Sequence, residues 1–162
     1  MRKIALFFVL ALGISFSSNA QTYRVPIGFF TGSNLAIGPA FINGSTFAWF
    51  QWNADISYSI SPKISGGIEA GLVTINFGGA AFSFVAKGGY HFPLSKGQLI
   101  TNAGIGGLFG GGGGGLLLQP DVRYRYELTP FLFAEGGVRM PIVLGSATSV
   151  ALVPHVGLMY SF

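Results

Sequence analysis

The chain has 162 residues, of which 50% are hydrophobic and 9% are charged, whereas soluble domains usually carry about 25% charged residues. The length suffices for one domain, and so few charges are typical of a protein that resides in lipid rather than in water. The absence of cysteine excludes disulfide bonds, thiolate metal sites, a cysteine nucleophile and a lipoprotein anchor.

The formal net charge of +4 overstates how basic the functional chain is. Arg2 and Lys3 belong to an N-terminal segment that we expect to be removed, which leaves seven of the nine basic residues against five acidic ones. An excess of about two positive charges indicates no polyanionic partner, so we expect no nucleic-acid ligand.

Residues 1–20 read as a cleavable signal peptide. Arg2 and Lys3 form its positive start, Ile4–Phe16 its apolar centre, and Ser18-Asn19-Ala20 a cleavage site of small residues. An N-terminal anchor helix is the alternative, but the apolar stretch is short for spanning and the cleavage motif follows it directly. We therefore expect a mature chain of residues 21–162 that begins at Gln21 and forms one domain.

Later apolar runs are too short for membrane helices. A spanning helix needs about 20 consecutive apolar residues, and Gly, Pro, Asn, Ser or a charge interrupts every run after the signal peptide well before that length. A closed β-barrel is the other structure that satisfies all backbone hydrogen bonds within lipid. Composition and run length together therefore predict an all-β transmembrane barrel, and seven turn signals along the chain make it an eight-stranded antiparallel up-and-down barrel.

Turn-forming residues divide the mature chain into eight predicted strands. The strands span residues 33–43, 46–60, 64–75, 80–93, 98–109, 115–128, 131–142 and 149–162. The first and fifth carry the weakest signal, because they are rich in Gly and Ala and have little polar face. The connections are Asn43-Gly44-Ser45, Ser61-Pro62-Lys63, Asn76–Gly79, Pro93–Gly97, Gly110–Gly115, Thr129-Pro130 and Gly145–Thr148.

Apolar and polar residues alternate along these strands with a period of two. In the second strand, one face is Phe50, Trp52, Ala54, Ile56, Tyr58 and Ile60, and the other is Gln51, Asn53, Asp55, Ser57 and Ser59. The sixth strand shows the clearest alternation, with Asp121, Arg123, Arg125 and Glu127 all on one face. Such alternation predicts strands with one lipid-facing and one lumen-facing side.

The charged residues of the strands all fall on the predicted inner face. A Lys or Arg on the lipid face would cost roughly 2–4 kcal/mol at mid-depth, which explains the bias. We expect these residues to form a charge network that fills the lumen, since the interior of eight strands is just wide enough for side chains. The network comprises Asp55, Glu69, Lys87, Asp121, Arg123, Arg125, Glu127, Glu135 and Arg139.

Aromatic residues gather near both predicted ends of the barrel. Trp52, Phe50, Phe82 and Phe84 are expected near the outer ends, and Tyr58, Tyr90, Phe92, Tyr126, Tyr160 and Phe162 near the periplasmic ends. The outward residues between these two groups include Ala54, Ile56, Ala86 and Gly88. Two aromatic girdles around an aliphatic band are typical of membrane barrels.

The last strand ends in the pattern polar-x-Gly-x-x-aromatic-x-aromatic, formed by His155, Gly157, Tyr160 and Phe162. This ending resembles the signal by which outer-membrane barrels are recognised by their assembly machinery. The mature chain as a whole resembles the small eight-stranded outer-membrane families, the OmpX-like proteins and the OmpA-type transmembrane domains. It departs from them in its short extracellular loops and glycine-rich middle, which argues against adhesion through the loops.

The resemblance implies location in the outer membrane of a Gram-negative bacterium, reached through the periplasm. The expected partners are outer-membrane lipid and lipopolysaccharide, and the barrel assembly machinery during biogenesis. Nothing in the sequence suggests an oligomer, so we expect a monomer. No cofactor or metal site is expected, because His91 and His155 are isolated and each lies on an inward phase.

The favoured function is a structural barrel with a filled lumen, which supports membrane integrity or serves as a scaffold. A narrow channel is the first alternative. A lipid A-modifying enzyme is less favoured, because such barrels use His and Ser near the outer rim, where neither histidine is expected. A soluble barrel that binds an apolar ligand would need the two faces inverted. Because neither histidine is expected near the outer rim, we expect no enzymatic activity.

Overall fold

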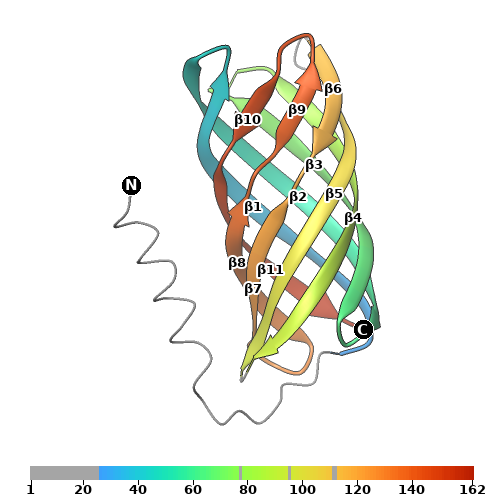
Figure 1. The fold of residues 1–162 in the computed structure, drawn as a ribbon. Helices are drawn as coiled ribbons and strands as arrows, with labels where there is room; N and C mark the ends of the chain where they lie inside the picture. Colours follow the sequence, from blue (N-terminus) through green and yellow to red (C-terminus); the bar gives the residue numbers. More distant parts are fainter. Residues whose placement is uncertain (1–25, 77, 95, 111–112) are drawn as a thin grey trace, which may run out of the picture.

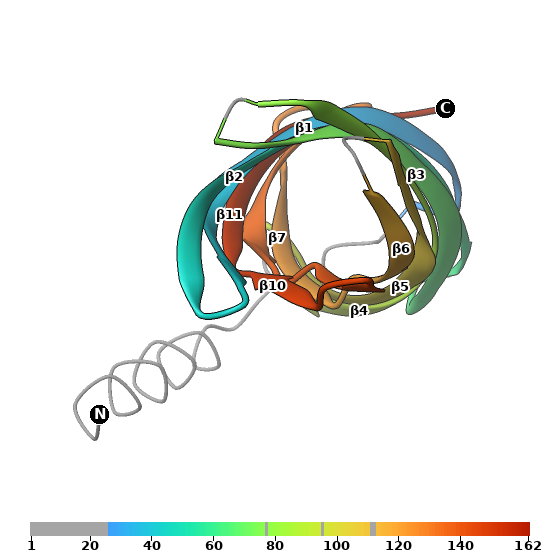
Figure 2. The same ribbon diagram turned by 90° about the horizontal axis from the view of Figure 1, so that it is seen from above.

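The computed structural model describes residues 26–76, 78–94, 96–110 and 113–162. The predicted signal peptide 1–20, Gln21 and Arg24 lie outside the described residues. Figure 1 shows strands that wind around one axis, and Figure 2, a view along that axis, shows that they form a closed ring. Within the described residues, no helix has both the length and the apolar character to cross a membrane.

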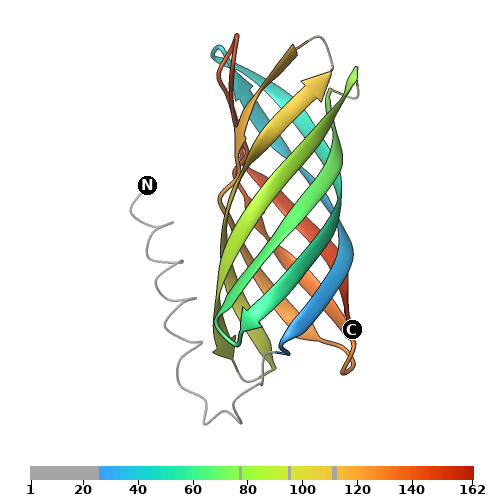
Figure 3. The same cartoon turned by 90° about the vertical axis from the view of Figure 1, so that its right-hand side faces the viewer.

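The ring contains eleven β-segments. They are β1 (Gly28–Ile42), β2 (Ser45–Ser61), β3 (Ile64–Ile75), β4 (Ala80–Leu94), β5 (Gly97–Gly110), β6 (Gly113–Leu118), β7 (Asp121–Glu127), β8 (Leu132–Arg139), β9 (Ile142–Gly145), β10 (Ser149–Ala151) and β11 (Val153–Ser161). All paired neighbours are antiparallel. Figure 3 shows that the strands are tilted relative to the barrel axis, as closure of a sheet requires.

Three of the eight predicted strands are each divided into two segments. β6 and β7 are separated at Pro120, and β8 and β9 at Pro141, because proline has no backbone N–H to donate to the ladder. β10 and β11 are separated at Leu152, whose N–H donates to the carbonyl of Pro39 at 3.0 Å. Met140 likewise donates to Pro120 at 2.9 Å, so hydrogen bonding between neighbours continues across the interruptions. The eleven segments therefore form eight strands, as predicted.

The barrel closes between the first and last strands. β1 pairs along its length with β2, and its other edge pairs with β10 and β11, from Ile42 opposite Ser149 to Phe30 opposite Ser161. The N–H of Phe162 donates to the carbonyl of Phe29 at 3.0 Å, which places the start of β1 beside the C-terminus. We call this the periplasmic end and the opposite one the outer end, following bacterial barrels with an even number of strands.

The first strand starts earlier than predicted. β1 begins at Gly28 rather than residue 33, because Gly28 through Phe30 pair with the periplasmic half of β2, at Ser59 to Ser57. The predicted turn at Asn43-Gly44 is present, and both residues have positive φ, 49° and 81°, as a two-residue hairpin turn needs. The predicted glycine connection 110–115 is shorter in the structure, because β5 includes Gly110 and β6 starts at Gly113; residues 111 and 112 lie outside the described residues.

The exterior is apolar around the whole ring. Large hydrophobic side chains are exposed on the outward phase of every long strand, among them Leu35, Ile56, Leu72, Phe84, Ile105, Val122, Val138 and Val156. Aromatic side chains accompany them near the ends, including Trp52, Phe82, Tyr90, Tyr126 and Tyr160. Inward positions are buried and mostly polar in the periplasmic half. An apolar outside around a polar inside is the arrangement of a membrane barrel and the reverse of a soluble one.

Candidate functional site in the barrel lumen

The inward face of β2 passes through successive layers of the lumen. Trp49 lies in an apolar layer, and its Nε1 donates to the Oε1 of Gln51 at 3.3 Å. Gln51 donates to Asn53 at 3.0 Å, and Asn53 donates to Asn34 of β1 at 3.0 Å. Asp55 follows at the next inward position and belongs to the ion pairs below. The strict alternation of one strand thus leads from an apolar layer, through amides, to buried charge.

Arg123 is the centre of the buried ion pairs. Its Nε donates to Asp121 at 2.7 Å, and its Nη1 lies 3.0 Å from Glu135 Oε2 and 3.6 Å from Asp55 Oδ2. Glu135 also accepts from the Nε of Arg125 at 2.6 Å. One guanidinium therefore links carboxylates from β2, β7 and β8, which is possible because arginine offers five donors in a fixed fork.

A second set of ion pairs surrounds Glu69 on β3. Arg139 Nη2 lies 3.0 Å from Glu69 Oε2, and Lys87 Nζ lies 3.5 Å from the same oxygen. Gln119 donates to the other carboxylate oxygen at 2.8 Å. Lys87 also forms an ion pair with Asp55, which joins this set to the pairs around Arg123. The two sets therefore form one continuous network across the lumen.

The network balances four carboxylates with four cations among the described residues. Its members are Asp55, Glu69, Asp121, Glu135, Lys87, Arg123, Arg125 and Arg139, all of whose side chains are buried. Glu127 differs from the sequence prediction: it is half-buried at the end of β7, and its side chain forms no ion pair with another described residue. The charge balance of the network is therefore exact without Glu127, whereas the sequence suggested one surplus acid.

Glycines on the inner face provide space for the network. A Cβ added to Gly137 would lie 2.7 Å from both Cα and Cβ of Arg123, and one added to Gly157 would lie 2.7 Å from the Cβ of Asn34. On the outer face, the nearest atom to a Cβ added to Gly136 would be the carbonyl oxygen of His155, at 3.9 Å. Consecutive glycines in these strands therefore have different roles, and the inward one is required for packing.

A serine, a histidine and a glutamine form a hydrogen-bonded chain near the periplasmic end. Ser65 Oγ lies 2.7 Å from His91 Nε2, and His91 Nδ1 lies 2.7 Å from Gln98 Oε1. This order resembles a nucleophile, a base and an orienting group. The cavity beside Ser65, however, has a volume of about 10 Å³, which is room for about one water and none for an ester.

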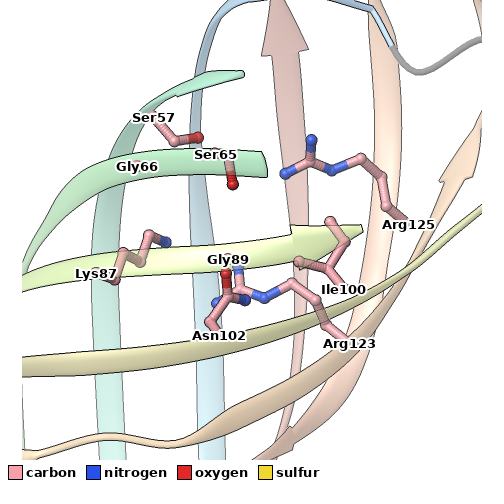
Figure 4. A pocket seen from close by; sticks show the side chains of 9 residues that line it. All are labelled: Ser57, Ser65, Gly66, Lys87, Gly89, Ile100, Asn102, Arg123 and Arg125. Carbon is pink, nitrogen blue, oxygen red and sulfur yellow. The ribbon is translucent and has the colours of Figure 1, made fainter. Parts of the chain in front are cut away.

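Figure 4 shows this small cavity and the side chains around it. Ser65 of β3, Lys87 of β4, and Arg123 and Arg125 of β7 point into the same space. Three cationic side chains surround a space with room for about one water molecule. The cavity is thus an interstice of the charge network.

The four residues of the predicted assembly signal lie in different environments. His155 faces the lumen, where its Nε2 lies 2.9 Å from Asp121 Oδ1. Gly157 is also on the inner face, whereas Tyr160 and Phe162 are exposed on the outside with ring centroids 5.2 Å apart. His155 therefore belongs to the buried polar network, and the two aromatic residues belong to the exterior.

Apolar residues close the lumen on either side of the charges. Near the periplasmic end, Phe30, Phe133 and Met159 form a buried cluster, and the guanidinium of Arg125 lies 4.6 Å from the ring centroid of Phe30. In the outer half, a larger apolar cluster lies in the lumen. It comprises Ala36, Ala40, Trp49, Val73, Val85, Leu117, Val143, Ala151 and Val153.

The sequence indicated the charges but not all of their neighbours. Gln119 donates to Glu69, and Gln98 is hydrogen-bonded to His91; both glutamines are buried. Because their side chains are uncharged, the sequence did not distinguish them as members of the network. Gln119 shares its predicted strand and its inward phase with Arg123 and Arg125, whereas Gln98 begins a predicted strand without any charge to set its phase. No group of three or more His, Cys, Asp and Glu side chains in the described part of the chain has the arrangement of a metal site.

Comparison with known proteins finds similarity in fold but not in sequence. No family model matches the chain, and no curated protein matches it. The crystal structure of Neisserial surface protein A covers 83% of this chain and 97% of its own, with a TM-score of 0.66 and 15% identity. The N-terminal β-barrel domain of Pseudomonas aeruginosa OprF covers 88% of this chain and 100% of its own, with a TM-score of 0.54 and 13% identity.

The outer membrane protein OprG from Pseudomonas aeruginosa is a third similar structure, with a TM-score of 0.53 and 10% identity over 89% of this chain and 99% of its own. At these identities the comparison establishes the fold alone. That fold agrees with the resemblance stated from the sequence, and it fits the apolar exterior and closed ring.

Proposed function

We propose that this eight-stranded outer-membrane β-barrel is a sealed structural protein of the membrane, not a channel and not an enzyme. The observation that carries the proposal is the charge network across the lumen, in which four carboxylates and four cations are buried and joined through Arg123 and Lys87. A barrel filled in this way contributes a rigid, closed body to the membrane.

The lumen is blocked at three levels, which argues against the channel alternative. An ion moving from the periplasmic end would meet the Phe30, Phe133 and Met159 cluster, then the ion pairs, then the apolar layer around Trp49 and Leu117. Passage would require breaking buried ion pairs, each of which would leave an unpaired charge and cost about 3–5 kcal/mol. We therefore expect no measurable current through the lumen.

The geometry also argues against the lipid A-modifying alternative. His91 and Ser65 lie near the periplasmic end, inside the ring, whereas an enzyme acting on the outer leaflet needs its groups at the outer rim and on the lipid side. His155 is buried against Asp121 at mid-strand. Neither histidine reaches a surface that an acyl chain could approach.

The proposal includes a route and a set of partners. We infer that residues 1–20 direct export to the periplasm and are removed, and that residues 21–162 are then inserted by the barrel assembly machinery. The aromatic end at Tyr160 and Phe162 would be the part that this machinery recognises. The exposed apolar band would contact lipid and lipopolysaccharide directly, with the chain present as a monomer.

Planar-bilayer recordings test the sealed lumen. The purified, folded barrel should give no unitary current steps above the protein-free baseline at any applied voltage, while a 16-stranded porin in the same bilayers shows that the assay detects pores. Discrete current steps that scale with the amount of this protein would reject the sealed lumen and favour the channel alternative.

A further inference from the structure

The outer end of the lumen contains a cavity that the proposed structural role does not use. Its volume is about 350 Å³, and its walls come from β1, β3, β4, β5, β6, β9 and β10. Strands from nearly the whole ring therefore surround it, so it is the outer mouth of the barrel and not a groove on the lipid side.

Most of the side chains that line this cavity are apolar, and exposed backbone and two serines supply polar atoms. The side chains that define it are Ile42, Val73, Ile75, Ala81, Leu108 and Val143. Glycines line part of the rest of the cavity, and Ser146 and Ser149 provide its polar side-chain atoms. None of the described charged residues lines the cavity. Since the interior of an outer-membrane barrel is normally polar, an apolar mouth needs a separate explanation.

The cavity has a closed floor. Val73 and Val143 line it and also belong to the buried apolar cluster that contains Trp49, Val85 and Leu117. Trp49 is only 1% exposed, and its indole N–H is directed to Gln51 in the amide ladder. The cavity thus opens outward and ends above the charge network, which makes it a blind pocket and not the entrance of a pore.

The volume is that of a small-molecule site. An apolar cavity of about 150 Å³ inside a protein binds benzene, and ligand pockets generally begin near 300 Å³. At about 350 Å³ this pocket can hold a molecule roughly twice the size of benzene. Its lack of charged groups favours an uncharged ligand, because an ion would lose its hydration without gaining a partner.

We propose that the outer end of the lumen is a binding site for a small, uncharged, apolar molecule that enters from the outside of the cell. Val73 and Val143 form opposite parts of the wall, and the apolar layer around Trp49 and Leu117 forms the floor. The molecule is held and not transported, because the buried amides and then the charge network lie beneath this layer. Binding here does not depend on whether the lumen conducts, so the two proposals are tested separately.

Trp49 can report occupancy, because it lies in the apolar cluster whose members Val73 and Val143 line the cavity. The chain has two tryptophans, and Trp52 lies on the outer face with 44% exposure, so Trp52→Phe leaves Trp49 as the sole indole. Bromobenzene, an uncharged apolar quencher, should reduce Trp49 fluorescence in a saturable manner in the refolded barrel. Iodide, a charged quencher, should have little effect on Trp49 fluorescence.

Two neighbouring alanines of β4 supply a matched pair of variants. Ala81 is buried and lines the pocket, whereas Ala80 is exposed on the opposite face. In the Trp52→Phe background, Ala81→Phe should fill the pocket and abolish saturable quenching, and Ala80→Phe should preserve it. Heat-modifiable gel migration confirms that each variant is folded.

A second pair covers the case in which Ala81→Phe fails to fold. Val143→Phe fills the opposite wall, and Leu144→Phe places the same ring outside. Quenching that saturates, and that is lost only in the inward variants, supports the site. Quenching that rises linearly with bromobenzene and is equal in inward and outward variants reflects partition into detergent and would overturn the proposal.

Discussion

Glu69 illustrates how each residue of the lumen depends on its partners. Its carboxylate faces Arg139 at 3.0 Å and Lys87 at 3.5 Å and accepts a hydrogen bond from Gln119 at 2.8 Å. Burial makes every unpaired member of such a network costly, while complete replacement of a pair by apolar groups is often neutral. The contribution of a charge here is therefore a property of the pair.

We expect Glu69→Ala to lower the free energy of unfolding by about 3–5 kcal/mol, because it leaves Arg139 buried without its carboxylate. The double variant Glu69→Leu/Arg139→Met should recover most of that loss. Urea unfolding of the barrel in lipid vesicles measures both. Lys63→Ala, in an exposed turn, is the control and should change stability by less than about 0.5 kcal/mol. Equal stability of Glu69→Ala and wild type would show that the pair is not buried.

The paired glycines of β8 give a second test at single residues. Gly137→Ala should destabilise the barrel, because the added Cβ would lie 2.7 Å from Arg123 Cα and Cβ. The Cβ added by Gly136→Ala would point outward, with its nearest neighbour at 3.9 Å. This variant should stabilise the barrel by about 0.5–1 kcal/mol, because alanine lowers the conformational entropy of the unfolded chain. Vesicle unfolding curves compare the two, and the same sign of change in both would refute the assignment of faces.

The strands show how far alternation in the sequence determines structure. Phase was predictable: apart from Glu127, the inward charges of β7 and β8 are buried, and the outward residues Val122 and Val138 are exposed. The boundaries of the strands were less predictable than their phase. Gly28–Gly32 of β1 carries little alternation and is ordered by pairing with β2, a contact distant in sequence. The breaks at Pro120 and Pro141 follow from proline chemistry, but only the ladder shows that the ring continues past them.

The C-terminal strand carries a prediction about assembly. Phe162 is 75% exposed, and its ring contacts only Tyr160 among the described aromatic residues, so it adds little to packing. Phe162→Ala should lower the amount of folded barrel in the outer membrane of cells, since assembly would lose its recognition residue. Refolding of the purified variant into detergent should match wild type. Both are read from heat-modifiable gel bands.

His155→Gln is the informative comparison for that experiment. Its side chain is in the lumen, 2.9 Å from Asp121, so its replacement should affect stability in both settings and not assembly alone. Normal cellular assembly of Phe162→Ala would show that the terminal aromatic is not recognised. Loss in both settings would assign Phe162 to folding instead.

At the scale of the whole molecule, the barrel is a stack of lumen layers within an apolar wall. The sequence predicted the wall and the charged layer, because both depend on alternation within a strand. It did not predict the amide ladder from Gln51 to Asn34 or the apolar outer layer, because these arise where inward residues of several strands reach the same height. That height is fixed by register and tilt, which one strand alone does not reveal.

The other consequences of this structure depend on the apolar exterior facing lipid. The chain lacks cysteine, so a single spin label at Val156, outward in β11 and 66% exposed, can report its surroundings directly. In vesicles, its collision rate should be high with oxygen and low with a water-soluble nickel chelate, whereas a label at the exposed turn residue Lys63 should show the reverse. Nickel accessibility at Val156 equal to that at Lys63 would contradict a membrane-embedded barrel.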